Sequence, residues 1–363
     1  MADATTILIV DAEVLEAGGP VRTPVRSATR DWSERRGLLL RLRDREGGEG
    51  WGEASPLPGY SPDSLHRVGA VLRSVPFDGL PPLDPGRPLG PQLEAALQRV
   101  GPGAPSAQFA VETALLDLCG RRWGAPVHRL LGGSAETRPV PLCALVDGDD
   151  EEAVARSAEA AVAGGMRALK LKIGADPSRD RERAMAVRRA VGTDVSLRLD
   201  ANGSFREDRA VEALEALRCA DPELVEEPVA PHVVRRLGRW PVPLGADESL
   251  QDARARPVVE ALTREGAYRA WVLKPMALGG ALACMRLAAR ARAAGADPIV
   301  SHLFDGPIAL AAAAELALAL GGRRAAGLAP HVGLSAWPER PLAALSGGHL
   351  VPHDRPGLGW GEA

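Results

Sequence analysis

Five charged residues follow one another through the second half of the chain, and their types are those of an acid/base site with a metal ion. They are Lys172, Asp200, Glu226, Asp247 and Lys274, and neighbours in this series are between 21 and 28 positions apart. Each interval has room for one strand, one helix and the connection back. Residues that end successive parallel strands meet at one mouth of a barrel. The pattern therefore predicts three carboxylates between two lysines.

The three carboxylates, Asp200, Glu226 and Asp247, are expected to bind a divalent cation. Their ligand atoms are all oxygens, which suit Mg²⁺, and Mn²⁺ would also fit such a set. The seven histidines show no spacing typical of a zinc site. A bound Mg²⁺ would offset the negative charge that develops when a proton is removed next to a substrate carboxylate. The expected cofactor is therefore Mg²⁺.

Two lysines of one predicted strand, Lys170 and Lys172, point to the same side because side chains alternate along a strand. Repulsion from Lys170, together with partial burial, would lower the pKa of Lys172 toward the range in which a neutral amine accepts a proton. Lys172 is therefore the candidate base. Lys274 would approach from the opposite side of the barrel, and the sequence leaves open whether it is a second acid/base or a cation that stabilises the enolate.

Each of these motifs also has an ordinary structural interpretation. A Lys-x-Lys pair is most often part of a solvated surface, and Glu226-Glu-Pro228 could be an acidic turn. Asp247-Glu-Ser249 could be a plain helix cap. Charged residues at five successive strands are harder to explain by chance, so we favour the interpretation as an active site.

After about residue 138, short apolar segments alternate with helical segments rich in Ala and Arg, as in repeated βα units. A closed α/β barrel is favoured over an open doubly wound sheet because no Gly-x-Gly-x-x-Gly follows the first strand of the series. The expected strands span residues 140–144, 168–172, 196–200, 224–226, 244–246, 271–273, 298–301 and, as the weakest of the eight, 325–328.

The beginning of the chain has a different pattern. Strands are expected at residues 5–16 and 37–43, joined by a long loop over residues 18–36 that is rich in Pro, Arg, Ser and Thr. The density of Gly and Pro at residues 50–60 predicts a second exposed loop without regular structure. The N-terminal part is therefore expected to be an antiparallel meander with two loops.

A helix is expected over residues 107–119, with Gly120 as its stop signal. The tail after residue 330 is rich in Gly and Pro, and we expect it to return to the N-terminal unit. The expected division is an N-terminal α+β unit at residues 1–135, a barrel at residues 136–330 and a returning segment at residues 331–363.

Composition limits the classes of partner. The 363 residues carry a formal net charge of −3, which gives no field strong enough to recruit nucleic acid or an anionic membrane. The longest apolar stretch, residues 308–320, is shorter than the roughly 20 residues that a membrane span needs. The N-terminus lacks a basic flank followed by an apolar run, so we expect a cytoplasmic protein. The expected partner is a small carboxylate substrate, and assembly into a homo-oligomer is left open.

Five motifs together resemble the enolase superfamily, and within it the muconate-lactonizing-enzyme subgroup. They are Lys170-Leu-Lys172, Leu197-Arg-Leu-Asp-Ala-Asn202, Val225-Glu-Glu-Pro228, Ala246-Asp-Glu-Ser249 and Leu273-Lys-Pro275. The resemblance covers nearly the whole chain. It implies a modified TIM barrel, (β/α)₇β, under an α+β capping domain built from the N-terminal segment and the C-terminal tail. It also implies that loops near residues 22–30 and 53–61 close over the substrate.

The resemblance also implies roles for single residues. Asp200, Glu226 and Asp247 look like metal ligands, and Lys172 and Lys274 look like the acid/base pair. The supporting residues would be Lys170, Arg198, Asn202 and Glu248.

Within the subgroup the chain is most similar to the o-succinylbenzoate synthases of menaquinone biosynthesis. The similarity rests on Gly52-Glu-Ala-Ser-Pro-Leu-Pro-Gly59, on Arg198, and on Ser301-His-Leu-Phe-Asp-Gly-Pro-Ile-Ala-Leu310. It implies dehydration of 2-succinyl-6-hydroxy-2,4-cyclohexadiene-1-carboxylate, with Lys172 as the base and Lys274 as a lasting cation. Family members often carry a Ser-rich run where this chain has only the first Ser.

The same similarity implies substrate contacts from Gly59, Tyr60 and Ser301, whereas His302 and Asp305 receive no role. The alternative function is an N-succinylamino acid racemase or a dipeptide epimerase, both of which use two opposed lysines. A dipeptide epimerase would be expected to show Asp-x-Asp near residues 301–303, and this chain does not. A barrel that has lost catalysis and only binds is a third hypothesis, against which the retention of all five charged positions argues.

Overall fold

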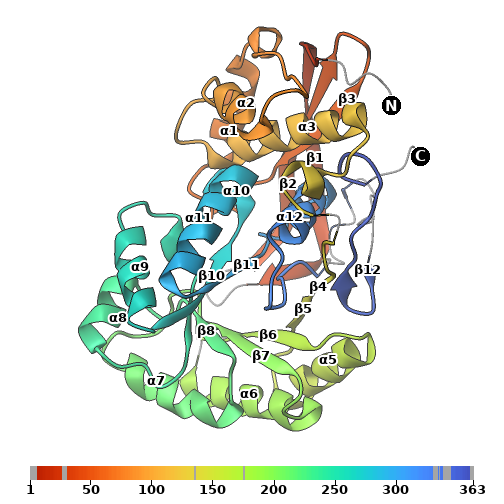
Figure 1. Cartoon of the computed structure of the whole chain (residues 1–363). Helices are drawn as coiled ribbons and strands as arrows, with labels where there is room; N and C mark the ends of the chain where they lie inside the picture. Colours follow the sequence, from red (N-terminus) through yellow and green to blue (C-terminus); the bar gives the residue numbers. More distant parts are fainter. Residues whose placement is uncertain are drawn as a thin grey trace.

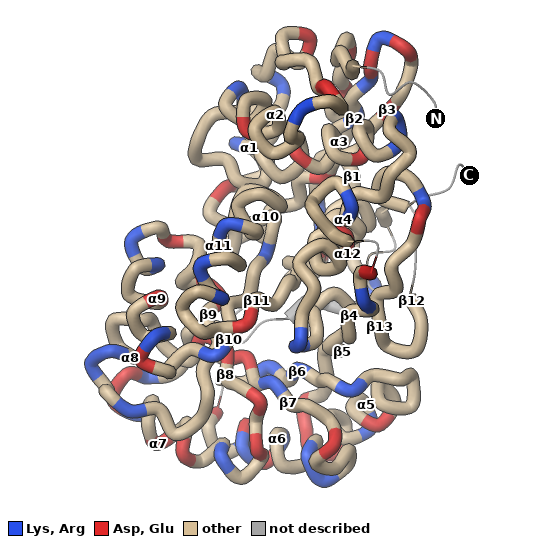
Figure 2. Tube along the Cα trace, viewed as in Figure 1, with Lys and Arg blue, Asp and Glu red and all other residues tan. Residues whose placement is uncertain are grey.

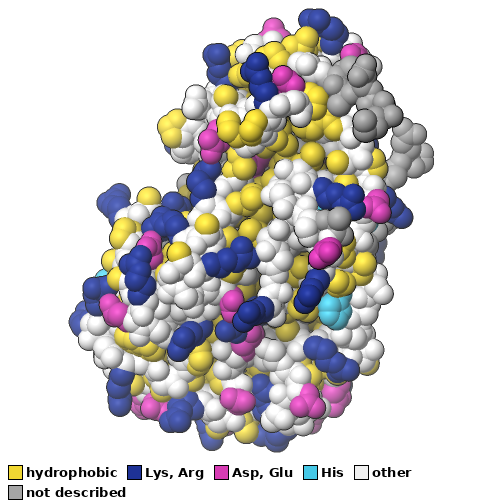
Figure 3. Space-filling model, in the orientation of Figure 1, with side chains coloured by type: hydrophobic (Ala, Val, Ile, Leu, Met, Phe, Trp, Pro, Cys, Tyr) yellow, Lys and Arg dark blue, Asp and Glu magenta, His cyan; other side chains and the backbone are white. Residues whose placement is uncertain are grey.

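The computed structural model describes residues 6–26, 31–134, 136–174, 176–329, 334, 336–337 and 345–359 (Figure 1). An N-terminal domain of one small sheet and several helices lies above a larger domain in which strands and helices alternate (Figure 1). Charges of both signs are spread over the two domains along the chain trace (Figure 2). They are also interspersed on the face seen in the space-filling view (Figure 3).

The N-terminal sheet is an antiparallel meander in the order β1-β2-β3, and its strands are longer than predicted. Its strands are β1 (Ile9–Arg26), β2 (Asp31–Asp44) and β3 (Glu49–Ala54). The expected loop over residues 18–36 is wrong, because the pairing of β1 with β2 continues from Gly18 opposite Arg36 to Arg26 opposite Asp31, with one irregularity on the way. The sequence of this segment lacks the apolar alternation by which a strand is recognised, and its residues 27–30 lie outside the described residues.

The expected loop over residues 50–60 is wrong in its first half, which forms β3. The glycines of β3 allow close packing against a helix. A Cβ atom added to Gly50 would lie 2.2 Å from the carbonyl oxygen of Ala114, and a Cβ atom added to Gly52 would lie 1.9 Å from the carbonyl oxygen of Ala110. Both carbonyls belong to α3, so the strand can lie against the helix only where it has no side chain. The stretch is also not exposed, since Glu53 and Ser55 are fully buried.

Three α-helices follow the sheet: α1 (Leu65–Ser74), α2 (Leu89–Leu97) and α3 (Pro105–Trp123). Helices α1 and α3 pack against the sheet, whereas α2 packs against α3. A short 3₁₀ turn, η1 (Phe77–Gly79), joins α1 to α2. The predicted stop at Gly120 is wrong, because the helix continues to Gly124, which has the left-handed conformation typical of a C-cap. Gly120 is instead a contact position, where a Cβ would meet the Cα of Gly357 at 2.6 Å.

The barrel is a curled parallel sheet of seven strands in the order β11-β10-β9-β8-β7-β6-β5. The strands are β5 (Cys143–Val146), β6 (Ala168–Lys172), β7 (Ser196–Asp200), β8 (Leu224–Glu226), β9 (Leu244–Ala246), β10 (Tyr268–Leu273) and β11 (Asp297–Val300). Four of them, β6 to β9, have the predicted bounds. Buried parallel strands read as short apolar runs, which is why they are easy to locate.

The eighth predicted strand, residues 325–328, is present only as two isolated bridges. Ala326 pairs with Leu142, just before β5, and Gly327 pairs with Ser301, just after β11. The segment therefore lies between the two edge strands and closes the barrel, although it is too short to count as a strand.

Helices surround the barrel and return the chain from each strand to the next (Figure 1). Asp150 and Asp176 cap two of them by accepting backbone N–H groups of the first turn. The α-helices are α4 (Val127–Leu130), α5 (Glu151–Ala163), α6 (Pro177–Val191), α7 (Ala210–Leu217), α8 (Pro231–Leu237), α9 (Arg256–Arg264), α10 (Pro275–Leu278), α11 (Ala281–Ala294) and α12 (Pro307–Leu320), with 3₁₀ turns η2 (Arg218–Ala220) and η3 (Glu248–Leu250). Among the described helices, none combines the length and apolar character needed to cross a bilayer.

The described part of the C-terminal tail does return to the N-terminal domain. A hairpin of β12 (Leu345–Ser346) and β13 (His349–Leu350) pairs with β4 (Val140–Pro141) ahead of the barrel. Farther on, the backbone N–H of Leu358 donates to Asp117 of α3 at 2.9 Å. The remainder of residues 331–363 lies outside the described residues.

Candidate active site

The three predicted carboxylates lie side by side at the ends of neighbouring strands. Asp200 ends β7, Glu226 ends β8 and Asp247 directly follows β9. Each residue is at most 2% exposed. One oxygen from each carboxylate lies within 4.8 Å of the other two. Parallel pairing with Asp200 opposite Glu226 brings them together, as the spacing along the chain predicted.

Lys170 lies between two of these carboxylates. Its Nζ is 2.8 Å from Oδ2 of Asp200 and 2.5 Å from Oε2 of Glu226. Burial opposes the charge on Lys170, but the carboxylates outweigh burial and raise its pKa well above the ordinary value. Lys170 is therefore an ammonium ion that partly neutralises the acidic cluster.

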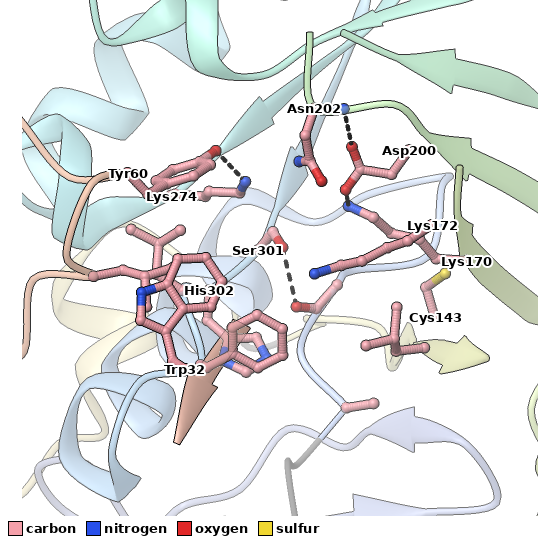
Figure 4. Close-up of a pocket in the computed structure, with 16 residues that line it drawn as sticks. Trp32, Tyr60, Cys143, Lys170, Lys172, Asp200, Asn202, Lys274, Ser301 and His302 are labelled. Atoms are coloured by element: carbon pink, nitrogen blue, oxygen red, sulfur yellow. Dashed lines mark hydrogen bonds and ion pairs between the residues drawn. The ribbon is translucent and has the colours of Figure 1, made fainter. Parts of the chain in front are cut away.

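Lys172 follows two residues later on the same face of β6, and its amine reaches the cavity (Figure 4). Its Nζ lies 4.8 Å from the centre of the Phe304 ring, a distance at which a ring face attracts a cation. Burial is the largest cause that lowers the pKa of Lys172 to about 8, and the charges of Lys170 and Lys274 act in the same direction. The predicted direction is confirmed, with burial contributing more than repulsion from Lys170.

Lys274 reaches the same cavity from β10 and is held from two sides (Figure 4). Its Nζ lies 2.5 Å from Oδ2 of Asp247 and donates to the hydroxyl of Tyr60, whose ring centre is 4.4 Å away. The Tyr60 hydroxyl in turn donates to Oδ1 of Asp247 at 3.0 Å. Burial opposes the charge, but Asp247 and Glu248 outweigh it and raise the pKa of Lys274.

Two predicted supporting residues, Asn202 and Glu248, lie beside the carboxylates. The Asn202 backbone N–H donates to Asp200 Oδ1 at 3.1 Å, and its side-chain amide donates to Glu248 Oε1 at 2.9 Å. Sequence reasoning missed Glu227, which accepts the backbone N–H of Asp247 at 2.7 Å and the hydroxyl of Ser249. The Glu226-Glu227 doublet was visible in the sequence, but only the fold shows that the second carboxylate orients the next ligand.

The cavity above the lysines has a largely apolar far wall, with contributions from both domains (Figure 4). Tyr60 and Ser301 line it as predicted, and His302 does so too, whereas Gly59 does not. The Ser301 hydroxyl donates to the carbonyl of Gly327 at 3.2 Å, so its hydrogen is used within the protein. Lining residues that sequence reasoning missed are Trp32, Leu57, Cys143, Leu145, Leu303, Phe304, Gly327 and Ala329.

Arg198, predicted as a supporting residue, does not line the cavity. It lies deeper in the barrel, where its Nε donates to Glu223 at 2.7 Å and its Nη1 donates to the carbonyl of Ala325 at 2.7 Å. The second bond reaches the segment that closes the barrel. Arg198 therefore supports the barrel wall rather than the substrate.

The carboxylate cluster fits a hard divalent cation. All three candidate ligands offer oxygen, which Mg²⁺ prefers. One further buried oxygen, Oε2 of Glu248, has no hydrogen-bond partner among the described residues. A concentration of buried carboxylates that Lys170 and Lys274 only partly neutralise is an arrangement that a cation would stabilise.

Another group of metal-type residues lies away from this site. Glu315 of α12 accepts from the ring of His128 at 2.9 Å and from the ring of His353 at 2.8 Å. These bonds join the C-terminal tail to α4 and α12, so the group has a structural explanation.

A barrel that gathers buried carboxylates and lysines at its mouth beneath a second domain defines an enzyme of the enolase superfamily. The comparisons agree with this class. Residues 153–361 match the family model described as enolase C-terminal domain-like, and residues 9–132 match the N-terminal domain of mandelate racemase / muconate lactonizing enzyme. The chain therefore belongs to the mandelate racemase / muconate lactonizing enzyme subgroup of the enolase superfamily.

Relatives of several activities are similar over most of the chain. Muconate cycloisomerase 1 of Pseudomonas putida is 30% identical, over 87% of this chain and 85% of the relative. L-Ala-D/L-Glu epimerase of Bacillus subtilis is also 30% identical, over 85% and 84%. The solved dipeptide epimerase of Enterococcus faecalis, complexed with Mg and the dipeptide L-Leu-L-Tyr, aligns with a TM-score of 0.85 at 25% identity, over 97% and 99%.

Proposed function

We propose that the protein is a Mg²⁺-dependent racemase or epimerase that moves the α-proton of an N-acylated amino acid between its two faces. N-succinylamino acids and dipeptides both belong to this substrate class. The observation that carries the proposal is the use of lysine. The chain has 44 Lys and Arg residues, of which only Lys170, Lys172 and Lys274 are lysines, and all three line one cavity.

Arginine cannot lose its proton at neutral pH, whereas a buried lysine can. The chain uses arginine at every other Lys or Arg position. Lysine is thus found only beside the acidic cluster, where the lowered pKa of Lys172 allows that amine to exchange a proton. Sequence reasoning overlooked this count, although it is visible in the composition.

Lys172 and Lys274 have distinct parts in the proposed reaction, while Lys170 stays an ammonium ion beside the carboxylates. A Mg²⁺ ion held by Asp200, Glu226 and Asp247 would supply positive charge next to the substrate carboxylate and so acidify the neighbouring C–H bond. Lys172, with its lowered pKa, takes the α-proton on one face. Lys274 delivers a proton on the opposite face, and the two exchange roles in the reverse direction.

The epimerases among the relatives support this reaction type. One of them matches 85% of the chain in sequence, and another, which aligns over 97% of the chain, was solved with Mg and a dipeptide. The missing Asp-x-Asp near residues 301–303 disfavours a substrate with a free amino group in that place. An N-acyl group without a positive charge, as in the N-succinylamino acids, therefore fits better than a dipeptide.

A second candidate is the dehydration that forms o-succinylbenzoate, a step of menaquinone biosynthesis. One observation favours it: the two lysines are unequal, since the pKa of Lys172 is lowered and that of Lys274 is raised. A one-base reaction needs this inequality, because Lys172 would remove the α-proton and return it to the departing hydroxide while Lys274 stays cationic.

Incubation in D₂O with Mg²⁺ distinguishes the two. A racemase exchanges the α-hydrogen of both enantiomers of an N-succinylamino acid and interconverts them, as seen by proton NMR and chiral chromatography. A dehydratase leaves these compounds unlabelled and converts the cyclohexadiene carboxylate, which changes its ultraviolet absorbance. Inactivity of the wild-type protein in both assays would reject both candidates.

A further inference from the structure

Arg35 is a buried cation of the N-terminal domain that lies behind the cavity rather than in it. It belongs to β2 and is 1% exposed. Its Nη2 donates to the carbonyl of Ser55 at 2.6 Å and to that of Leu303 at 3.3 Å. Its Nη1 donates to Pro56 at 3.2 Å and its Nε to Phe304 at 3.1 Å. One planar guanidinium thus binds four carbonyls of two separate loops.

The two loops have one property in common: each carries an aromatic ring that contacts a lysine of the site. The loop after β3 carries Tyr60, whose ring centre lies 4.4 Å from Nζ of Lys274. The loop after β11 carries Phe304, whose ring centre lies 4.8 Å from Nζ of Lys172. Arg35 is therefore bonded to the backbone of both ring-bearing segments, one from each domain.

The loop after β11 needs such support because its backbone is strained. Phe304 has a φ of 53°, in the left-handed region that residues with a large side chain rarely adopt. A conformation of this kind persists only where its surroundings fix it, and Arg35 binds the carbonyls of both Leu303 and Phe304. The bonds thus hold the backbone that directs the Phe304 ring toward Lys172.

The charges around Arg35 explain why the residue must stay cationic. Burial lowers the pKa of Arg35, and the nearby carboxyl groups of Asp305 and Glu53 oppose that effect. Glu53 accepts the backbone N–H groups of Gly306 and Ala309 at the start of α12. Burial and the charge of Glu53 raise the pKa of Asp305 to about 7, and the positive charge of Arg35 opposes this rise more than that of Lys274 does.

We propose that Arg35 is a positioning residue, which sets the Phe304 and Tyr60 rings against the two lysines by joining the loops that carry them. The rigid fork of the guanidinium is what the role requires, since a lysine has the charge but cannot reach four carbonyls from one plane. The proposal deepens the proposed function, because it concerns the same two amines.

NMR of the lysine side chains tests the proposal without any substrate. The chain has three lysines, so isotope-labelled lysine gives three sets of ε-methylene signals. A ring face shifts nearby protons upfield, so in the Mg²⁺-loaded wild-type protein the Lys172 and Lys274 signals should lie upfield of the Lys170 signal. Arg35→Met and Arg35→Lys should both move these two signals toward the ordinary lysine position, and should leave Lys170 in place.

Arg36→Met is the matched control, because Arg36 is the next residue on β2, has a side chain 63% exposed and pairs only with Glu34 among the contacts described. It should leave all three signals unchanged. Arg35→Lys keeps the buried charge opposite Asp305, so it remains informative where Arg35→Met does not fold. Folded Arg35 variants whose Lys172 and Lys274 signals keep their wild-type positions would overturn the proposal.

Activity gives a second and separate readout. We expect α-deuterium exchange in the Arg35 variants to fall by roughly 10- to 100-fold in kcat, because small displacements of catalytic groups have effects of this size, with KM changed much less. Phe304→Leu should slow α-deuterium exchange from the enantiomer whose proton Lys172 removes more than exchange from the other enantiomer. An inactive wild-type protein would reject the proposed function alone, since the NMR result does not depend on turnover. An Arg35→Lys variant with the wild-type kcat would show that the planar guanidinium group is not needed to position the two loops.

Discussion

The lowered pKa of Lys172 gives the most direct prediction about mechanism. Burial lowers this pKa from 10.5 to about 8. At pH 7 about one Lys172 side chain in ten is then neutral, against about one in three thousand at the ordinary pKa, a gain of about 300-fold in available base. Because the neutral form is the base, kcat/KM should rise with pH and level off above a midpoint near 8.

Labelled-lysine NMR can assign that midpoint to a residue. One of the three ε-methylene signals should titrate near pH 8, and the α-exchange rate should follow the same curve. Lys172→Arg should remove both the ε-methylene signal that titrates near pH 8 and the rise of the α-exchange rate with pH, because an arginine keeps the charge but cannot act as a base. Lys172→Ala should lower exchange from one enantiomer by about 10²- to 10⁴-fold, the usual contribution of a general base.

Two results would refute this reasoning. One is a Lys172 signal that titrates at the ordinary lysine pKa while the enzyme is active at pH 7. The other is a Lys172→Ala variant that exchanges both enantiomers at the wild-type rate.

Three further predictions concern the supports of the site. Glu227→Gln should weaken Mg²⁺ binding by about 10- to 100-fold in calorimetry, because Glu227 orients the backbone of Asp247; unchanged affinity would mean that this contact is dispensable. Arg198→Met should lower the free energy of unfolding by about 1–3 kcal/mol in urea titration, since it removes the hydrogen bonds to Glu223 and to the closing segment while Glu223 keeps its ion pair with Arg324, and an unchanged free energy of unfolding would contradict the structural role. Gly52→Ala should be destabilised by about 1–3 kcal/mol or more, because its Cβ would overlap a carbonyl of α3; a wild-type melting temperature would show that the strand and helix can separate at no cost.

The catalytic end of the barrel could be predicted because its signals are local. Strand β8 is a short apolar run and β7 alternates leucines with polar residues, each strand ends in a carboxylate, and parallel pairing alone places Asp200 beside Glu226. Lys170 and Lys172 share a face through the alternation of side chains on β6. These inferences need only the order of the elements.

The features that were missed depend on contacts between distant segments. Gly120 was predicted to end the helix because the residue that it packs against, Gly357, lies 237 positions farther along the chain. The local sequence gives no sign of that contact. Arg198 was predicted as a supporting residue, but the residue that it supports could not be predicted, because its partner carbonyl in Ala325 is 127 positions away along the chain. The cavity wall shows the same limit, since Trp32 and Phe304 meet there from the two domains. The sequence pattern of a single segment does not predict contacts between such distant segments.

Anomalous diffraction from a crystal grown with Mn²⁺ in place of Mg²⁺ tests the central claim most directly. We predict one strong peak within about 2.3 Å of oxygens from Asp200, Glu226 and Asp247, with the amines of Lys172 and Lys274 on opposite sides of the bound ion. No peak at these carboxylates, or a peak only at His128, Glu315 and His353, would contradict the account.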